Sequence, residues 1–245
     1  MRAASETVKH LLIINSIFFL ATLVIGDFTY DLFALHYYDS PKFKYWQIIT
    51  HMFMHGDFSH ILFNMIGLWM FGTPIEQIWG KNKFIFFYLS TGLGAAALQM
   101  ILYYFQIYQA NELFITLNTD KSIISEFYIS SRLPSNIINS LDVRSLQSAF
   151  SAFNSVLVGA SGALYGVLVA FAMLFPNTHL MLLFPPIPIK AKFLVPILIA
   201  ADVFFGFSSY SIGPIAHFAH VGGALTGFIM FQYWKKNQFN NNRWD

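Results

Sequence analysis

Residues 155–175 read SVLVGASGALYGVLVAFAMLF, an apolar run that contains no charged side chain. A helix needs about 20 apolar residues to cross the hydrocarbon core of a bilayer, which is roughly 30 Å thick. This stretch is therefore predicted to span a membrane, with a re-entrant start as the alternative for its first residues. Similar runs occur on both sides of it, so lipid rather than water is the expected solvent of most of the chain.

Five further apolar stretches complete a predicted bundle of six transmembrane helices. They cover residues 11–26, 59–75, 84–104, 193–207 and 214–234. The composition agrees, because 56% of the 245 residues are hydrophobic and only 11% are charged, whereas a soluble domain carries about 25% charged residues. The predicted fold class is an all-α polytopic membrane bundle, formed as a single domain by residues 1–245.

The composition also narrows the functional classes. A formal net charge of only +2 gives no support to a nucleic-acid partner. The absence of cysteine excludes disulfides, cysteine–zinc sites and a thiol nucleophile. The first apolar stretch follows Arg2 and Lys9, as in a signal peptide, but Val24-Ile25-Gly26-Asp27 is a poor cleavage site. A retained first helix is therefore favoured.

Lysine and arginine predict the orientation of the bundle. An even number of helices places both termini on one side, and most basic residues fall on that side. They are Arg2, Lys9, Lys81, Lys83, Lys190, Lys192, Lys235, Lys236 and Arg243. The positive-inside rule then predicts that both termini are cytoplasmic, and the predicted location is the inner membrane of a bacterium. Two long loops, at about 27–58 and 105–154, would lie outside.

Polar side chains within the predicted spans are costly, and they mark function or packing. Helices two, four and six all run from the outside inward, and each carries its polar residues early. The set comprises His60 and Asn64 on helix two, Ser161 on helix four, and His217 and His220 on helix six. These side chains are therefore predicted to lie at one depth, toward the outer leaflet.

Glycine spacing predicts which of these helices touch. The motifs Gly162-x-x-x-Gly166 and Gly223-x-x-x-Gly227 each allow another backbone to approach closely. If the two glycine ridges pack together, Ser161 lies beside His220. Close approach is what a nucleophile and its base require.

The residue types suit nucleophilic catalysis. A serine hydroxyl becomes a nucleophile when a neighbouring base takes its proton, and a neutral imidazole is a suitable base near neutral pH. His60 and Asn64, which share one helix face, can donate to an oxyanion together with the Ser161 N–H at a helix start. No Asp or Glu lies early in an even helix, so a Ser161–His220 dyad is predicted, with Tyr165 packed on the imidazole.

Together these motifs resemble the rhomboid family. Its hallmarks are Gly-x-Ser-Gly on helix four, Ala-His-x-x-Gly-x-x-x-Gly on helix six and His-x-x-x-Asn on helix two. The matching stretches are Gly159–Gly162, Ala219–Gly227 and His60–Asn64, and Glu76 resembles a family glutamate at the inner end of helix two. One departure lies in the first outer loop, where many members have Trp-Arg and this chain has Trp46-Gln47.

The resemblance implies an intramembrane serine endopeptidase that cleaves transmembrane segments of membrane-protein substrates near their outer end. The implied site comprises the nucleophile Ser161, the general base His220, the oxyanion donors His60, Asn64 and the Ser161 N–H, and the supporting Gly159 and Tyr165. This chemistry requires no cofactor and no metal. The residues specify neither the natural substrate nor the oligomeric state.

Several of these residues have simpler interpretations. Gly159–Gly162 alone is typical of helix packing, and the matching motif on helix six is what favours catalysis. His217 and His220 form His-x-x-His without the glutamate base of zinc proteases, so zinc is not expected. His217 is instead expected to pack or hydrogen-bond near the site. His51 and His55, which precede helix two, are expected to contact the loop or lipid headgroups.

Two other functional classes stay open. A proteolytically inactive relative would bind transmembrane segments without cutting them, although the presence of both Ser161 and His220 favours activity. A small transporter is the other class. Asp202 within helix five needs a partner or water, but one acid is thin evidence for transport, and the inverted repeats typical of transporters are not visible.

Overall fold

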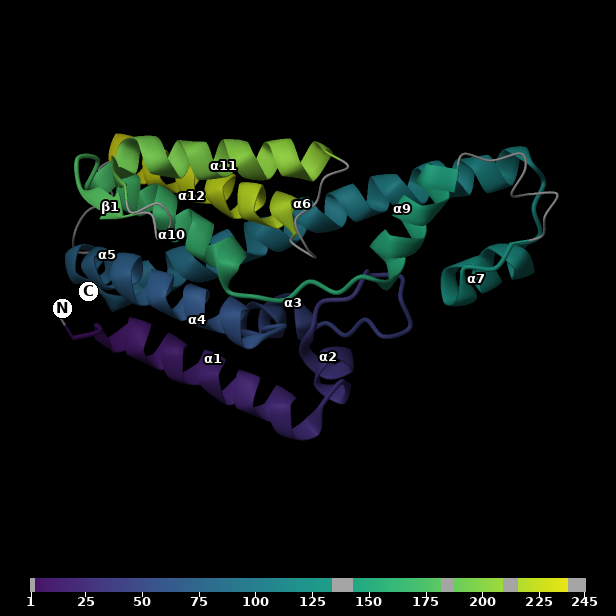
Figure 1. Cartoon of the computed structure of the whole chain (residues 1–245), viewed down its shortest axis with the longest axis horizontal. Coiled ribbons are helices and arrows are strands. Elements are labelled where there is room, and N and C mark those ends of the chain that lie inside the picture. Colours follow the sequence, from purple (N-terminus) through teal and green to yellow (C-terminus); the bar gives the residue numbers. More distant parts are fainter. Residues whose placement is uncertain (1–2, 134–142, 182–186, 209–215, 238–245) are drawn as a thin grey trace.

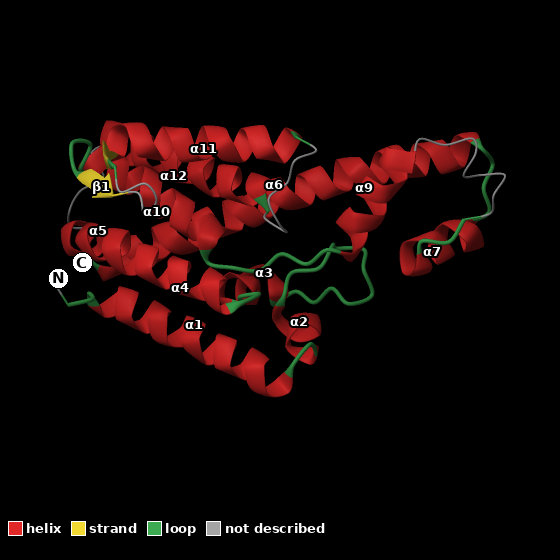
Figure 2. Cartoon of the chain, viewed as in Figure 1, coloured by secondary structure: helices red, strands yellow, loops and turns green. Residues whose placement is uncertain are grey.

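The computed structural model describes residues 3–133, 143–181, 187–208 and 216–237. The chain is built mainly of helices (Figure 1), and Figure 2 shows how little of it is strand. The helices are α1 (Glu6–Ile25), α2 (Phe28–Phe33), α3 (Gln47–Thr50), the 3₁₀ turn η1 (His51–Phe53), α4 (Phe58–Gly67), the π-helical turn η2 (Leu68–Gly72), α5 (Thr73–Trp79), α6 (Lys81–Thr116), α7 (Lys121–Ser130), α9 (Val143–Asn154), α10 (Ser161–Leu174), α11 (Ala191–Phe207) and α12 (His217–Asn237). Strands β1 (His179–Met181) and β2 (Pro188–Lys190) pair antiparallel.

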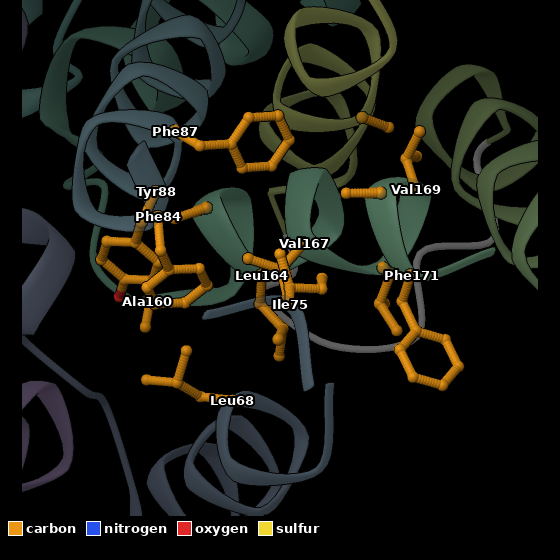
Figure 3. Packing of buried hydrophobic residues seen from close by; sticks show 14 of the residues in the cluster. Leu68, Ile75, Phe84, Phe87, Tyr88, Ala160, Leu164, Val167, Val169 and Phe171 are labelled. Atoms are coloured by element: carbon orange, nitrogen blue, oxygen red, sulfur yellow. The ribbon is translucent and has the colours of Figure 1, made fainter. Parts of the chain in front are cut away.

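Helix α10 forms the centre of the bundle. Most of its side chains are buried, and they lie on every side of the helix, as expected for a helix that is hydrophobic all round. Phe84, Phe87 and Tyr88 of α6 belong to the same buried cluster as Leu164 and Val167 of α10 (Figure 3). The apolar residues of α10 therefore form the core against which the neighbouring helices pack.

Helix α1, by contrast, turns much of its apolar surface outward. Leu23 and Val24 are 66% and 85% exposed, a pattern expected of side chains that face lipid. Among the described residues, three helices are long and apolar enough to cross a membrane, namely α1, Phe58–Trp79 and α6. Helix α10 is apolar but has only 14 residues. The number of six spans therefore stays a prediction.

The predicted third span ends too early. Residue 104 was the expected end, but α6 continues to Thr116. The reason is a second buried cluster, in which Ile107, Ala110 and Phe114 of α6 pack with residues of α7 and α9. In its described parts, the stretch predicted as an outer loop at 105–154 is thus a helical lobe that extends beyond the bundle (Figure 1). Burial of one face of α6 keeps this polar continuation helical.

The predicted fourth span begins too early. Helix α10 starts at Ser161, and residues 155–160 before it are not part of the helix. Leu157 forms an isolated antiparallel bridge with Leu35 of the first outer loop, with N···O distances of 2.9 and 3.0 Å. Ser161 therefore stands at the very start of its helix, where the backbone N–H groups have no intrahelical acceptor.

Helix α4, η2 and α5 form one continuous helix that contains a π-turn. Pro74 follows this turn, and proline both lacks an N–H and clashes with the preceding turn, which a widened turn can relieve. At the far end of the helix, Glu76 accepts hydrogen bonds from the N–H groups of Thr7 (2.8 Å) and Val8 (2.9 Å) and from the Ser5 hydroxyl. Glu76 thus caps α1 and ties it to the helix that carries His60.

Candidate active site

Helices α10 and α12 touch through their glycines. A Cβ added to Gly223 would lie 1.9 Å from the carbonyl oxygen of Gly162, and one added to Gly227 would lie 2.7 Å from the Cα of Gly166. No other residue fits at such distances, so glycine is what permits this approach. The predicted contact between the two glycine ridges is confirmed, and it brings the first turns of both helices together.

This contact places Ser161 beside His220. The His220 Nε2 lies 2.9 Å from the Ser161 Oγ, within hydrogen-bonding distance. The Tyr165 ring stacks on the imidazole, with 4.2 Å between centroids and planes 8° apart. The imidazole is therefore held on one face by an aromatic ring while its Nε2 is directed at the hydroxyl.

Gly159 shapes the approach to the serine. Its φ is +118°, a conformation that favours glycine. A Cβ there would lie 2.8 Å from the His60 Nε2 and 3.5 Å from the Ser161 Oγ, so the hydrogen atoms of Gly159 occupy the space between these two side chains. The Gly159 N–H donates to the carbonyl oxygen of His51 (2.9 Å), which anchors this turn to the first outer loop.

His60 and Asn64 face the same cavity as the serine. The cavity has a volume of about 590 Å³ and is lined by His60, Asn64, Ser161, Tyr165 and His220, among others. Asn64 is buried, and its Nδ2 has no hydrogen-bond partner among the described residues. The Gly56 N–H approaches the His60 Nδ1 at 3.5 Å, an arrangement that leaves the Nε2 as the protonated nitrogen on the cavity side. All the predicted site residues therefore meet at one place.

Asp57 fixes the start of the helix that carries His60 and Asn64. Its carboxylate caps α4 by accepting hydrogen bonds from the Ser59 hydroxyl and from the His60 N–H (2.9 Å). These bonds, led by that of Ser59, hold the pKa of the Asp57 carboxyl below its usual range. The cap sets where the first turn of α4 begins and so orients His60.

Gln47 holds together the loop in front of the site. This residue, at the position where many rhomboids have arginine, is fully buried. Its Nε2 donates to the carbonyl oxygens of Asp31 (2.9 Å) and Lys42 (3.0 Å), and its Oε1 accepts from the Lys44 N–H (3.1 Å). The amide therefore cross-links the outer loop despite the departure from the family pattern.

Asp202 is the site residue that the sequence reasoning missed. Its Oδ1 lies 3.1 Å from the Nδ1 of His220 and 2.6 Å from the Nδ1 of His217. The early turns of the even helices contain no acid. An odd helix runs the other way, so its late turns reach the same outer layer, and Asp202 lies late in α11. Helix parity therefore indicates the depth of Asp202 in the membrane, but not its contact with His220.

Comparison with known proteins identifies a family for the chain. The family model for the Rhomboid domain matches residues 42–107 and 121–236. The Rhomboid protease AarA of Providencia stuartii is 25% identical over 193 residues, which cover 76% of this chain and 54% of that protein. Rhomboid protein 1, mitochondrial, of Saccharomyces cerevisiae is 25% identical over 191 residues, which cover 77% of this chain and 42% of that protein.

A third relative matches over a shorter stretch. The Rhomboid protease GlpG of Salmonella newport is 37% identical over 68 residues, which cover 27% of this chain and 25% of that protein. The chain thus spans about half the length, or less, of the curated relatives it matches. The family match nevertheless covers most of the chain, including every residue of the site described above. This chain therefore belongs to the rhomboid family of integral membrane proteins.

Proposed function

We propose that this chain is a serine-type intramembrane endopeptidase that cleaves transmembrane segments of membrane proteins near their outer end. The observation that carries the proposal is the 2.9 Å contact between the His220 Nε2 and the Ser161 Oγ at a cavity that also holds His60 and Asn64. The names of the relatives AarA and GlpG, both rhomboid proteases, support the same reaction class.

The first half of the reaction forms an acyl-enzyme. His220 takes the hydroxyl proton of Ser161 at Nε2, and the Ser161 Oγ attacks the scissile carbonyl. The negative charge that develops on the carbonyl oxygen is stabilised by the side chains of His60 and Asn64 and by the Ser161 N–H at the start of α10. His220 then gives its proton to the leaving amine, and the peptide bond breaks.

The second half of the reaction is hydrolysis. Water enters the cavity, His220 takes its proton, and the resulting hydroxide attacks the ester carbonyl so that Ser161 is released with its proton restored. A substrate helix must unwind to expose its peptide bond, and residues of low helix propensity near the cut favour this unwinding. We therefore expect substrates to carry such residues near their outer end.

The proposal includes an orientation and a location. The start of α1, the end of α12 and the β1–β2 hairpin lie at one end of the bundle (Figure 1). Most basic residues belong to the segments that lie at this end. This distribution supports a cytoplasmic location for both termini in a bacterial inner membrane. The active-site cavity then opens toward the outer face. Residues 1–245 act as one domain, and its partners are transmembrane substrates and lipid.

The test is cleavage of a transmembrane reporter by the purified protein in liposomes. Wild type is compared with Ser161→Ala and His220→Ala. Ser16→Ala serves as the matched control, because Ser16 lies on α1 and its hydroxyl donates to the Leu12 carbonyl oxygen of the same helix. Wild type and the control should cut near the outer end of the segment. Both site variants should lose activity by roughly 10⁴-fold or more.

The outcomes separate the functional classes. Cleavage by Ser161→Ala would show that the assigned nucleophile is wrong. A folded wild type that binds reporters with destabilised helices, but never cuts them, would favour an inactive relative that binds transmembrane segments.

A further inference from the structure

Asp202 forms a buried hydrogen-bonded cluster with two histidines. Its Oδ1 accepts from the Nδ1 of both His220 (3.1 Å) and His217 (2.6 Å), and the Tyr165 hydroxyl is a further hydrogen-bonding partner of the carboxylate. Asp202 and His217 are both buried. A buried carboxylate without partners would be costly, and here one of its partners is the imidazole of His220, which touches Ser161.

The cluster decides which nitrogen of His220 carries the proton. A carboxylate can only accept hydrogen bonds, so the contact with Asp202 requires a proton on the Nδ1 of His220. In a neutral imidazole the Nε2 then has a free lone pair. That nitrogen is the one 2.9 Å from the Ser161 Oγ, which is the arrangement a general base needs.

The cluster also suits the charged state of the base. When His220 takes the serine proton it becomes an imidazolium, and a neighbouring carboxylate stabilises that charge inside a protein. The acid comes from α11, whereas the serine and the imidazole come from α10 and α12. Three helices therefore contribute to this chain of contacts, and the position of α11 bears directly on the chemistry.

We propose that Asp202 is a positioning residue for the proteolytic reaction, which holds His220 in the tautomer and orientation that leave its Nε2 free to accept the Ser161 proton. The proposal rests on the proposed function. Asp202 stays ionised throughout, while the proton moves from the Ser161 Oγ to the His220 Nε2 and then to the leaving amine. His217 is the second donor to the carboxylate and helps to hold it in place.

The experiment measures kcat and KM for a transmembrane reporter in liposomes, with Asp202→Asn, His217→Leu and Asp31→Asn. Asp202→Asn keeps the shape of the side chain and removes its negative charge. The second removes another partner of the same carboxylate but keeps the contact with His220. The third is the matched control, because Asp31 is an exposed acid paired with Lys42 at 2.9 Å, outside the cluster.

We expect Asp202→Asn to lower kcat on the order of 10²- to 10⁴-fold, with KM nearly unchanged. His217→Leu should lower kcat much less than Asp202→Asn does, even if the two variants lose the same amount of thermal stability. Asp31→Asn should behave like wild type. A wild-type kcat in Asp202→Asn would overturn the proposal. So would an equal loss of kcat in His217→Leu, since the carboxylate would then act only as an anchor between α11 and α12.

A second variant covers the case in which Asp202→Asn fails to fold. Asp202→Ala removes the carboxylate that accepts from the Nδ1 of His220, so kcat should fall with KM preserved, and a wild-type kcat would overturn the proposal. Activity of wild type and silence of Ser161→Ala establish the proposed function separately. An unaffected Asp202 variant would then reject the role of Asp202 alone.

Discussion

Gly159 combines two constraints at a single residue. Its φ of +118° strains any residue with a Cβ, and that Cβ would lie 2.8 Å from the His60 Nε2. The strain acts on the backbone that leads into Ser161, and the clash acts on a proposed oxyanion donor. Both effects are local to residue 159, because neither requires a helix to move.

Gly159→Ala should therefore lower kcat by roughly 10²-fold, comparable to the loss of one oxyanion donor. The matched control is Gly80→Ala, because Gly80 also has a positive φ (+76°), but an added Cβ would have no atom of the described residues beyond its chain neighbours within 4 Å. Kinetics with a transmembrane reporter, together with thermal melting of both variants, measure the two effects separately. Gly80→Ala should lose stability and keep kcat. Equal kcat values in the two variants would contradict the prediction.

At the scale of the elements, the α10–α12 contact decides whether Ser161 and His220 can meet. Both helices place glycine at the crossing, and the side chains that would hold them apart are missing. A shift of about 1 Å between reacting groups can cost on the order of 10² in rate. The geometry of two helices thus controls a distance between two side chains.

Gly223→Ala should separate these helices, because its Cβ would lie 1.9 Å from the Gly162 carbonyl oxygen. Overpacking of this kind costs about 1–3 kcal/mol, so both Tm in detergent and kcat should fall. Leu225→Ala is the control on the same helix, since Leu225 is 53% exposed and should have little effect on kcat. Wild-type activity in Gly223→Ala would show that the helices tolerate a wider spacing.

At the scale of the whole molecule, the first outer loop is joined to the active site through buried histidines. His51 and His55, which are predicted to contact the loop or lipid headgroups, are both buried, and for His51 the contact with the loop is confirmed. The His51 ring donates to the Gln47 carbonyl oxygen (2.9 Å), and its own carbonyl oxygen accepts from Gly159. Burial lowers the pKa of each imidazole from the usual 6.5 to about 4, so both are neutral in the folded protein well below neutral pH.

These two histidines should make the stability of the fold depend on pH. Unfolding allows both to bind a proton below about pH 6.5, so their contribution is complete above that pH and is lost as the pH falls toward 4. The free energy of unfolding should then fall by roughly 1 kcal/mol per histidine for each pH unit. Thermal melting between pH 8 and 5 measures this. His55→Phe keeps a ring and should reduce the slope, and an unchanged slope in this variant would rule the mechanism out.

Much of the fold and most of the site follow from local patterns. The apolar runs predict where helices lie, because burial in lipid or in the core is a property of the run itself. Parity and glycine spacing predict that His60, Asn64, Ser161 and His220 share a layer, because helical periodicity is regular enough to extrapolate. The end of α6 was missed because its continuation is stabilised by side chains of α7 and α9, which no window along α6 contains.

The remaining features depend on contacts between segments that are distant in sequence. The meeting of Asp202 with His220 requires the lateral placement of α11 against α12, and helix order alone does not provide it. The burial of His51 and His55 likewise arises only when the first outer loop folds onto the turn at Gly159. Sequence periodicity records which face of a helix is apolar. Which partner that face meets, and at what distance, is decided by the packing of the assembled bundle.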